Sequence, residues 1–257
     1  MNVLLALDVG NTHTVLGVFE NGRLRAHWRI ATDSEATADE LDVLLRSLFA
    51  GDGVDPGGVR GMIVSSVVPD YDAVLRKLAE KRFGVRPMFV EPGVRTGVPI
   101  CYDNPHEVGA DRIVNAVAAV ARYGAPVIVL DFGTATTFDV VGPKGEYLGG
   151  VIAPGLGISA DALFERAARL VRVDIRKPPR VIGRNTMESI QSGLFHGYSA
   201  LIEGVVGRLR EELGSEAKVV ATGGLAQVFA DELTFLDAVD PDLALEGLRI
   251  IWEKNVK

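Results

Sequence analysis

An aspartate followed by a short polar turn occurs twice in this chain, each time directly after an apolar run. Asp8 precedes Gly10, Asn11 and Thr12, and the second copy reads Asp-Phe-Gly-Thr at 131–134. A glycine in such a turn lets the backbone approach a ligand closely. Backbone N–H groups and hydroxyls then bind phosphate oxygens, while the carboxylate binds a hydrated cation. The pattern indicates a nucleotide site, although one copy alone is explained equally well as a turn that ends a strand.

The two copies are related by a constant offset that extends beyond the turn. The number of residues that separates Asp8 from Asp131 also separates the glycines of the two turns, and it separates a later glycine of the first half from its counterpart in the second. Such a repeat indicates two related halves. We therefore expect two acidic turns that hold a nucleotide and its metal ion between two domains.

A third candidate for chemistry is the tetrad Gly-Ala-Asp-Arg at 109–112, at the start of an expected helix. Asp111 can accept the proton of a hydroxyl group during phosphoryl transfer. Arg112 can bind a carboxylate through two parallel hydrogen bonds. An aspartate in the first turn of a helix is also stabilised by the helix dipole. For this tetrad taken alone, helix capping is the better interpretation.

The elements that position these residues alternate between strands and helices. Apolar runs indicate buried strands, apolar residues at helical spacing indicate helices, and Asn21-Gly22 indicates a hairpin. The expected strands are 3–7, 14–19, 24–30, 61–68, 87–90, 127–131, 135–141, 147–153 and 218–222. The expected helices are 37–49, 70–83, 107–123, 158–170, 187–213 and 241–253, with an irregular loop at 174–186. This order predicts an α/β fold of two domains, 1–118 and 119–257, each a mixed sheet with flanking helices.

Two of the expected helices carry apolar stripes. The stripe of the helix at 37–49 should face inward, and its residues are Leu41, Leu44, Leu45 and Leu48. The stripe of the helix at 187–213 fits either an intradomain core or a dimer interface, and its residues are Ile190, Leu194, Tyr198, Leu201 and Ile202.

The composition disfavours several classes of protein. The formal net charge of −7 disfavours a nucleic-acid binder, which needs a basic face. No apolar run is long enough to span a membrane, and the N-terminal segment lacks the basic residues of a signal peptide. Cys101 is the single cysteine, so no internal disulfide is expected, and the four histidines lack the spacing of zinc ligands. We expect a cytoplasmic protein without a nucleic-acid or membrane partner.

The repeated strand, acidic turn and hairpin resemble the superfamily of actin, sugar kinases and Hsp70 ATPases. The chain has neither a Walker A phosphate loop nor the glycine fingerprint of a dinucleotide fold. Thr222-Gly223-Gly224 follows an expected strand where that superfamily has its adenosine motif, although Gly-Gly is also common in tight strand–helix turns. The resemblance implies two ribonuclease-H-like (actin-like ATPase) domains that close on ATP.

More specific motifs resemble the type III pantothenate kinase family. They are DVGNT at 8–12, GADR at 109–112, DFGTATTFD at 131–139, GGVIAPG at 149–155 and GRNTMESIQSGLFHGY at 183–198. Their order and spacing cover nearly the whole chain. The resemblance implies ATP-dependent phosphorylation of pantothenate to 4′-phosphopantothenate, the first step of coenzyme A biosynthesis. It also implies a cytoplasmic homodimer with active sites at the subunit interface.

The same resemblance implies roles for individual residues. Asp111 would be the general base for the substrate hydroxyl. Pantothenate would be bound by Tyr102, Gly109, Ala110, Asp111 and Arg112, with Arg112 near its carboxylate, and by Thr186 of the partner subunit. ATP would be bound by Asp8, Val9, Gly10, Asn11, Thr12, His13, Thr14, Val15 and Thr134. Asp8 would act on Mg²⁺ through water, and Asp131 would bind a monovalent cation, K⁺ or NH₄⁺.

Two other functions are compatible with this fold. A non-catalytic regulatory homologue resembling Bvg accessory factor would keep the domains, but the presence of Asp8, Asp111 and Asp131 disfavours a loss of catalysis. A sugar kinase of the same superfamily is disfavoured by the segments at 109–112 and 183–186.

Overall fold

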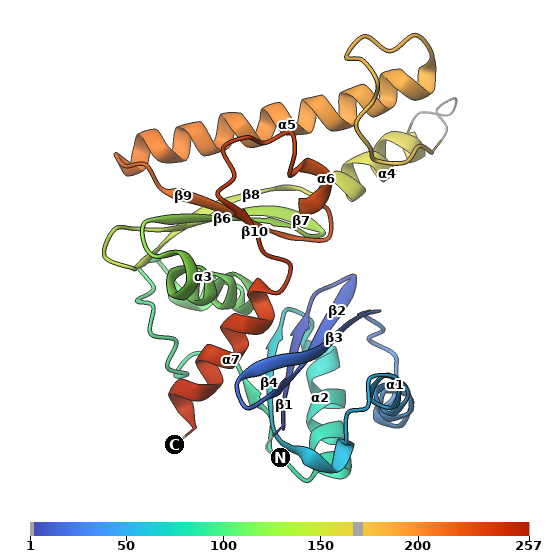
Figure 1. The fold of residues 1–257 in the computed structure, drawn as a ribbon, viewed down its shortest axis with the longest axis vertical. Coiled ribbons are helices and arrows are strands. Elements are labelled where there is room, and N and C mark those ends of the chain that lie inside the picture. The colour runs from blue at the N-terminus through green and yellow to red at the C-terminus, as the bar shows by residue number, and fades with distance from the viewer. Residues whose placement is uncertain (1–2, 167–171, 257) are drawn as a thin grey trace. The chain divides into compact units, whose positions relative to one another are not determined.

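The computed structural model describes residues 3–166 and 172–256, which form two compact units (Figure 1). One unit contains residues 1–118 and 242–257, and the other contains residues 119–241. The sequence placed 119–257 in the second domain, so its last segment differs from the expectation. The reason is helix α7 (Leu243–Asn255), which packs against strands β1 (Val3–Val9) and β4 (Val59–Ser66) of the first unit.

The first unit contains a five-stranded sheet in the order β3-β2-β1-β4-β5. Its other strands are β2 (His13–Glu20), β3 (Arg23–Ala31) and β5 (Met88–Phe89). The central strand β1 is antiparallel to β2 and parallel to β4. The predicted hairpin joins β2 to β3, and Asn21 and Gly22 have φ angles of 51° and 76°, as a type I′ turn requires.

Helices cover both faces of this first sheet. Leu7 belongs to the core formed with α1 (Ala38–Gly51) and α2 (Pro69–Leu78). Because side chains alternate along a strand, Asp8 points to the opposite face. That face is covered by α7, since a Cβ on Gly17 of β2 would lie 2.8 Å from the Leu245 side chain. Asp8 therefore lies at the end of the central strand, on the α7 side of the sheet.

Helix α1 begins where its capping residues predict. The Thr37 hydroxyl accepts a hydrogen bond from the Glu40 backbone N–H, and the Glu40 carboxylate accepts one from the Thr37 N–H at 2.8 Å. Leu41 and Leu45 are buried as predicted, but Leu44 is 39% exposed, so its predicted inward position is wrong. An aspartate one residue after Leu41 is buried instead, so the inward face of the helix is rotated relative to the predicted stripe.

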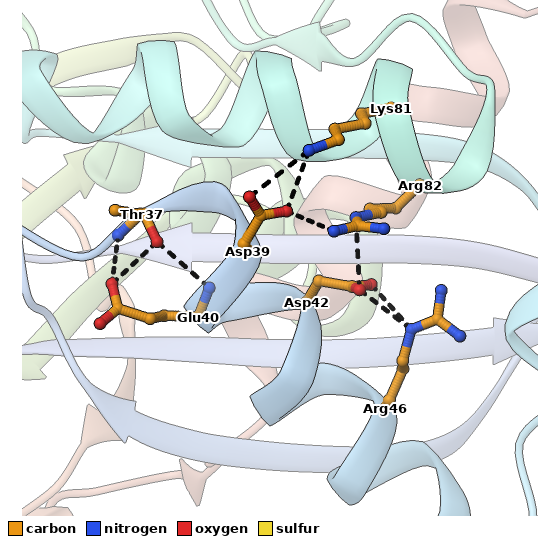
Figure 2. A network of polar contacts seen from close by, with 7 residues as sticks. All are labelled: Thr37, Asp39, Glu40, Asp42, Arg46, Lys81 and Arg82. Atoms are coloured by element: carbon orange, nitrogen blue, oxygen red, sulfur yellow. Dashed lines mark hydrogen bonds and ion pairs between the residues drawn. The ribbon is translucent and has the colours of Figure 1, made fainter.

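That aspartate, Asp42, belongs to an ion-pair network between α1 and the π-helical turn η2 (Ala79–Phe83) that continues α2 (Figure 2). Arg82 pairs with Asp39 and places its Nε 3.3 Å from an Asp42 oxygen. Lys81 Nζ lies 3.1 Å from Asp39, and Arg46 Nε lies 3.0 Å from Asp42. A buried carboxylate needs such partners, so the arginines allow Asp42 to occupy an inward position.

The second unit contains a five-stranded sheet of the same topology, in the order β10-β9-β6-β7-β8. Its strands are β6 (Val127–Phe132), β7 (Ala135–Val141), β8 (Tyr147–Pro154), β9 (Lys218–Gly223) and β10 (Ala238–Val239). Strand β6 is antiparallel to β7 and parallel to β9. It therefore corresponds to β1, and β9 corresponds to β4. The repeat in the sequence is a repeat of whole sheets.

The second unit also contains α4 (Leu156–Arg166), the long α5 (Thr186–Leu213) and the short α6 (Ala226–Phe229) (Figure 1). Phe229 stacks on Phe195 of α5 and on Phe132 of β6, with centroid distances of 5.2 and 5.3 Å. Tyr198 and Ile202 belong to the same core. The apolar stripe of α5 is thus mainly intradomain core.

One further helix can be compared with the expected elements. The helix predicted at 158–170 is α4, which begins two residues earlier, and positions 167–170 of that prediction lie outside the described residues. Within the described residues, no helix is both long enough and apolar enough to cross a membrane.

Candidate functional site

The first acidic turn is closed by a backbone hydrogen bond. Asp8 is half-buried, and the Gly10 N–H donates to the His13 carbonyl at 3.0 Å. A Cβ on Gly10 would lie 3.1 Å from that carbonyl oxygen, so the tight turn favours glycine. Asn11, Thr12 and His13 are exposed. The turn therefore presents short polar groups and exposed backbone beside a carboxylate.

Threonines hold this turn in place. The Thr32 hydroxyl donates to the Gly10 carbonyl at 2.7 Å, and the Thr32 N–H donates to the Thr12 carbonyl at 3.0 Å. The Thr32 hydroxyl also lies 2.9 Å from the hydroxyl of Thr14, which is buried. Val9 is buried as well. Of the residues predicted to bind ATP, Val9 and Thr14 thus contribute side chains that support the turn from inside.

The second acidic turn lies at the corresponding place in the second sheet. Asp131 is half-buried on β6, and the Gly133 N–H donates to the Ala135 carbonyl at 3.0 Å. In this turn the glycine N–H pairs with the carbonyl of the second residue after it, whereas in the first turn it pairs with that of the third. The second turn is therefore one residue shorter. The first turn therefore has a longer exposed tip.

Two glycines from other segments approach this second turn. A Cβ on Gly223 would lie 2.5 Å from Asp131 Oδ1, and a Cβ on Gly155 would lie 2.7 Å from the Gly133 carbonyl oxygen. The Gly155 N–H donates to the Thr134 carbonyl at 3.1 Å. The Asp131 carboxylate is therefore bordered by Gly223, and the Gly133 and Thr134 carbonyls are bordered by Gly155.

The Gly-Ala-Asp-Arg tetrad begins helix α3 (Ala110–Tyr123), as predicted. Asp111 is half-buried, and Arg112 is 8% exposed. The Arg112 backbone N–H donates to Asp111 Oδ1 at 2.9 Å. A Cβ on Gly109 would lie 2.5 Å from the same oxygen, so glycine at 109 makes room for the carboxylate.

Burial raises the pKa of Asp111 above the ordinary carboxyl value. The Arg112 backbone N–H and the charge of its guanidinium group oppose this rise in the pKa but do not cancel it. A carboxylate with a raised pKa binds a proton more readily, which suits a general base.

The remaining predicted residues lie elsewhere. Tyr102 is half-buried in the segment that precedes the short helix η3 (Pro105–Glu107). Thr186 is the first residue of α5, where the Asn185 side chain caps the helix by accepting from the Glu188 N–H at 2.9 Å. Thr186 lines an open surface hollow of about 650 Å³ between α4 and α5. No residue of either acidic turn is among the described residues that line this hollow.

The described residues contain no group of three or more histidine, cysteine or acidic side chains that could bind a metal ion by themselves. A cation at Asp8 or Asp131 would have one protein carboxylate as a ligand. Water, backbone carbonyls and phosphate oxygens would complete its coordination. At Asp8 this donor set suits Mg²⁺, which keeps several waters and binds through one or two carboxylates and substrate phosphates.

Strand register reveals two hydroxyl residues beside the two acids. Ser65 of β4 is the register partner of Asp8, and Thr222 of β9 is the register partner of Asp131. From the sequence, Thr222 stood out only as part of the Thr-Gly-Gly motif, and Ser65 did not stand out. The available signal was a serine at the end of an apolar run, which gains meaning only when β4 is paired with β1.

Comparisons with known proteins identify one family by sequence and similar folds among solved structures. A model of the type III pantothenate kinase family matches residues 4–208. The type III pantothenate kinase of Koribacter versatilis is 57% identical, over 98% of this chain and 96% of its own. A solved chain described as a Baf family transcriptional activator from Campylobacter jejuni has a TM-score of 0.61 at 20% identity, with 98% of each chain covered. One described as an N-acetylglucosamine kinase from Chromobacterium violaceum has a TM-score of 0.52 at 18% identity, with 97% of this chain and 98% of its own covered. At such identities, these two structures support the fold alone.

Proposed function

The chain belongs to the type III pantothenate kinase family and phosphorylates pantothenate with ATP in coenzyme A biosynthesis, and we propose that Asp111 is its general base. The observation that carries this assignment is the half-buried carboxylate at the start of α3, beside Arg112. Phosphoryl transfer requires alignment and charge neutralisation more than a strong base. Asp111 would orient the pantothenate hydroxyl and accept its proton late in the transfer.

Arg112 is the proposed partner of the pantothenate carboxylate. A guanidinium group binds a carboxylate in a fixed two-bond geometry. Because Arg112 directly follows Asp111, one helix start would hold both the carboxylate and the hydroxyl end of the substrate. Gly109 and Ala110 would contribute backbone at this helix start, and Tyr102 would line the same site.

The first acidic turn is the proposed binding site for the ATP phosphates. Residues 8–15 include the exposed polar tip and the buried threonine that supports it. Asp8 would hold Mg²⁺ through water, which fits its position as a single carboxylate beside exposed backbone. The bound Mg²⁺ would supply charge neutralisation to the phosphates, and the protein would supply their alignment.

The second acidic turn is the proposed site of a monovalent cation, with Thr134 contacting ATP. Asp131 supplies a carboxylate, and the neighbouring Gly133 and Thr134 supply carbonyl oxygens near Gly155. An all-oxygen site of low formal charge suits K⁺ or NH₄⁺ in this proposal.

We also propose a homodimer in which Thr186 of the partner subunit contacts pantothenate. Support comes from exposed apolar side chains near the start of α5. They are Leu163, Val181, Ile182 and Met187. Large exposed apolar groups at one place on a soluble protein mark an interaction surface. The proposed location is the cytoplasm, with which the single exposed thiol of Cys101 is compatible.

The direct test is the formation of 4′-phosphopantothenate by the purified protein with ATP and Mg²⁺, in potassium, ammonium and sodium buffers. Product in potassium or ammonium buffer but not in sodium buffer supports the cation site, and Asp131→Asn should abolish that difference. Equal rates in all three buffers would contradict the role of Asp131. A folded protein that forms no product in any buffer would favour the regulatory homologue.

A further inference from the structure

Ser65 is a buried hydroxyl residue with no hydrogen-bond partner among the described residues. Its side chain is fully buried, and its Oγ makes no hydrogen bond there. Most buried polar side chains in proteins have a partner, because an unsatisfied group keeps its full desolvation cost. A hydroxyl retained at such a place, at the end of β4, therefore calls for a physical reason.

The position of Ser65 points to the first acidic turn. Ser65 and Asp8 are register partners on adjacent parallel strands. Register partners project to the same face of a sheet. The Ser65 hydroxyl and the half-buried Asp8 carboxylate therefore lie side by side at the strand ends, on the face covered by α7.

The second sheet repeats this pairing of an acid with a hydroxyl residue. Thr222 is the register partner of Asp131 and is also buried. The Asp131 carboxylate is directed towards the end of β9, because its Oδ1 would lie 2.5 Å from a Cβ on Gly223. Since β9 corresponds to β4, a hydroxyl stands on the same side of the acid in both sheets.

We propose that Ser65 is a positioning residue for Asp8. Its hydroxyl donates a hydrogen bond to the Asp8 carboxylate when Mg²⁺ and ATP are bound, and this bond fixes which carboxylate oxygen faces the hydrated cation. The proposal rests on the role proposed above for Asp8. It explains why the chain has a buried hydroxyl that makes no hydrogen bond to the residues that the structure describes.

The test compares Ser65→Ala, Ser65→Thr and Ser65→Val. Threonine and valine have the same shape and differ in the hydroxyl, and threonine already occupies the equivalent position in the second sheet. The Kd of ATP is measured by calorimetry without pantothenate, with and without Mg²⁺, and the Tm of each ligand-free variant is recorded. We expect Ser65→Ala and Ser65→Val to raise the Kd in Mg²⁺ about tenfold, the lower end for a hydrogen bond to a charged group. Ser65→Thr should stay near the parent protein.

The Tm of the ligand-free variants distinguishes a residue that positions Asp8 from one that stabilises the fold. Removing an unsatisfied buried hydroxyl should leave the Tm of ligand-free Ser65→Ala unchanged or higher. An unchanged Kd for Mg²⁺–ATP in both Ser65→Ala and Ser65→Val would overturn the proposal. An equal loss of ATP affinity without Mg²⁺ would overturn it as well.

Asp8→Asn identifies which assignment fails. If Asp8→Asn weakens Mg²⁺–ATP binding and Ser65→Ala does not, the Ser65 proposal is wrong and the role of Asp8 stands. If Asp8→Asn has no effect on this binding, both are wrong. Phosphorylation of pantothenate by the parent protein is measured separately, so a failure of the kinase function remains distinguishable.

Discussion

Replacing Asp111 with asparagine removes the proposed base and its charge while keeping the shape of the side chain. The asparagine Oδ1 can still accept the hydrogen bond that the Arg112 N–H donates to Asp111 at 2.9 Å. The start of α3 therefore keeps its geometry. We expect kcat to fall about 10²- to 10⁴-fold, the range for losing a general acid or base, with little change in the Kd of ATP.

The same substitution makes a prediction about stability. Burial raises the pKa of Asp111 in the folded protein, so between the unfolded and folded pKa values the folded state binds more protons. Stability of the parent protein therefore falls as the pH rises through that interval, by about 1.4 kcal/mol for each pH unit that separates the two pKa values. The asparagine side chain cannot ionise, so at neutral pH the variant should be as stable as the parent or more stable. The difference should vanish in acid.

The assays are steady-state kinetics and thermal unfolding across pH 4 to 8. An ordinary carboxyl group has a pKa near 4, at the lower end of this range, so a raised pKa lies inside it. In the parent, kcat/KM should fall as the pH drops through the raised pKa of Asp111, and this acid limb should be absent in the variant. Near-parental turnover in Asp111→Asn would refute the base assignment. A Tm well below that of the parent at neutral pH would instead show that the carboxylate stabilises the fold.

Two further predictions concern substrate binding and assembly. Arg112→Lys keeps the charge but loses the two-bond geometry, so KM for pantothenate should rise about 10- to 100-fold. The KM for pantothenyl alcohol, which lacks the carboxylate, should not change in this way. An equal rise in KM for both compounds would contradict the carboxylate contact. Ile182 is 81% exposed. Ile182→Asp should be monomeric when measured by light scattering and should have lower activity, whereas the control Val43→Asp, at a 69% exposed position on α1, should remain dimeric. A dimeric Ile182→Asp would show that this segment is not part of the interface.

Local chemistry explains why much of the fold could be predicted. The hairpin at Asn21-Gly22 follows from the positive φ angles that these residues adopt readily. The start of α1 follows from Thr37 and Glu40, which cap it through contacts within four residues. The start of α3 was likewise predictable, because an aspartate in the first turn of a helix is stabilised by the helix dipole, whereas the role of Asp111 as a base came only from the family resemblance.

The parts that sequence missed depend on contacts between distant residues. Leu44 was assigned to the wrong side of α1 because Arg82, on another helix, allows Asp42 to face inward. The segment 242–257 was expected in the second domain because amphipathic spacing does not identify the sheet that a helix covers. Ser65 was overlooked because its neighbour Asp8 is set by strand register, which a sequence read in order does not reveal.

The placement of α7 has a consequence for how the protein is made. The first unit is discontinuous, because the whole second unit is synthesised between its early strands and α7. One face of the sheet that carries Asp8 must therefore wait for its covering helix until translation has passed the second unit. A nascent chain stalled before residue 242 would expose the apolar side chains on that face of the sheet. Chaperone binding during synthesis should concentrate there.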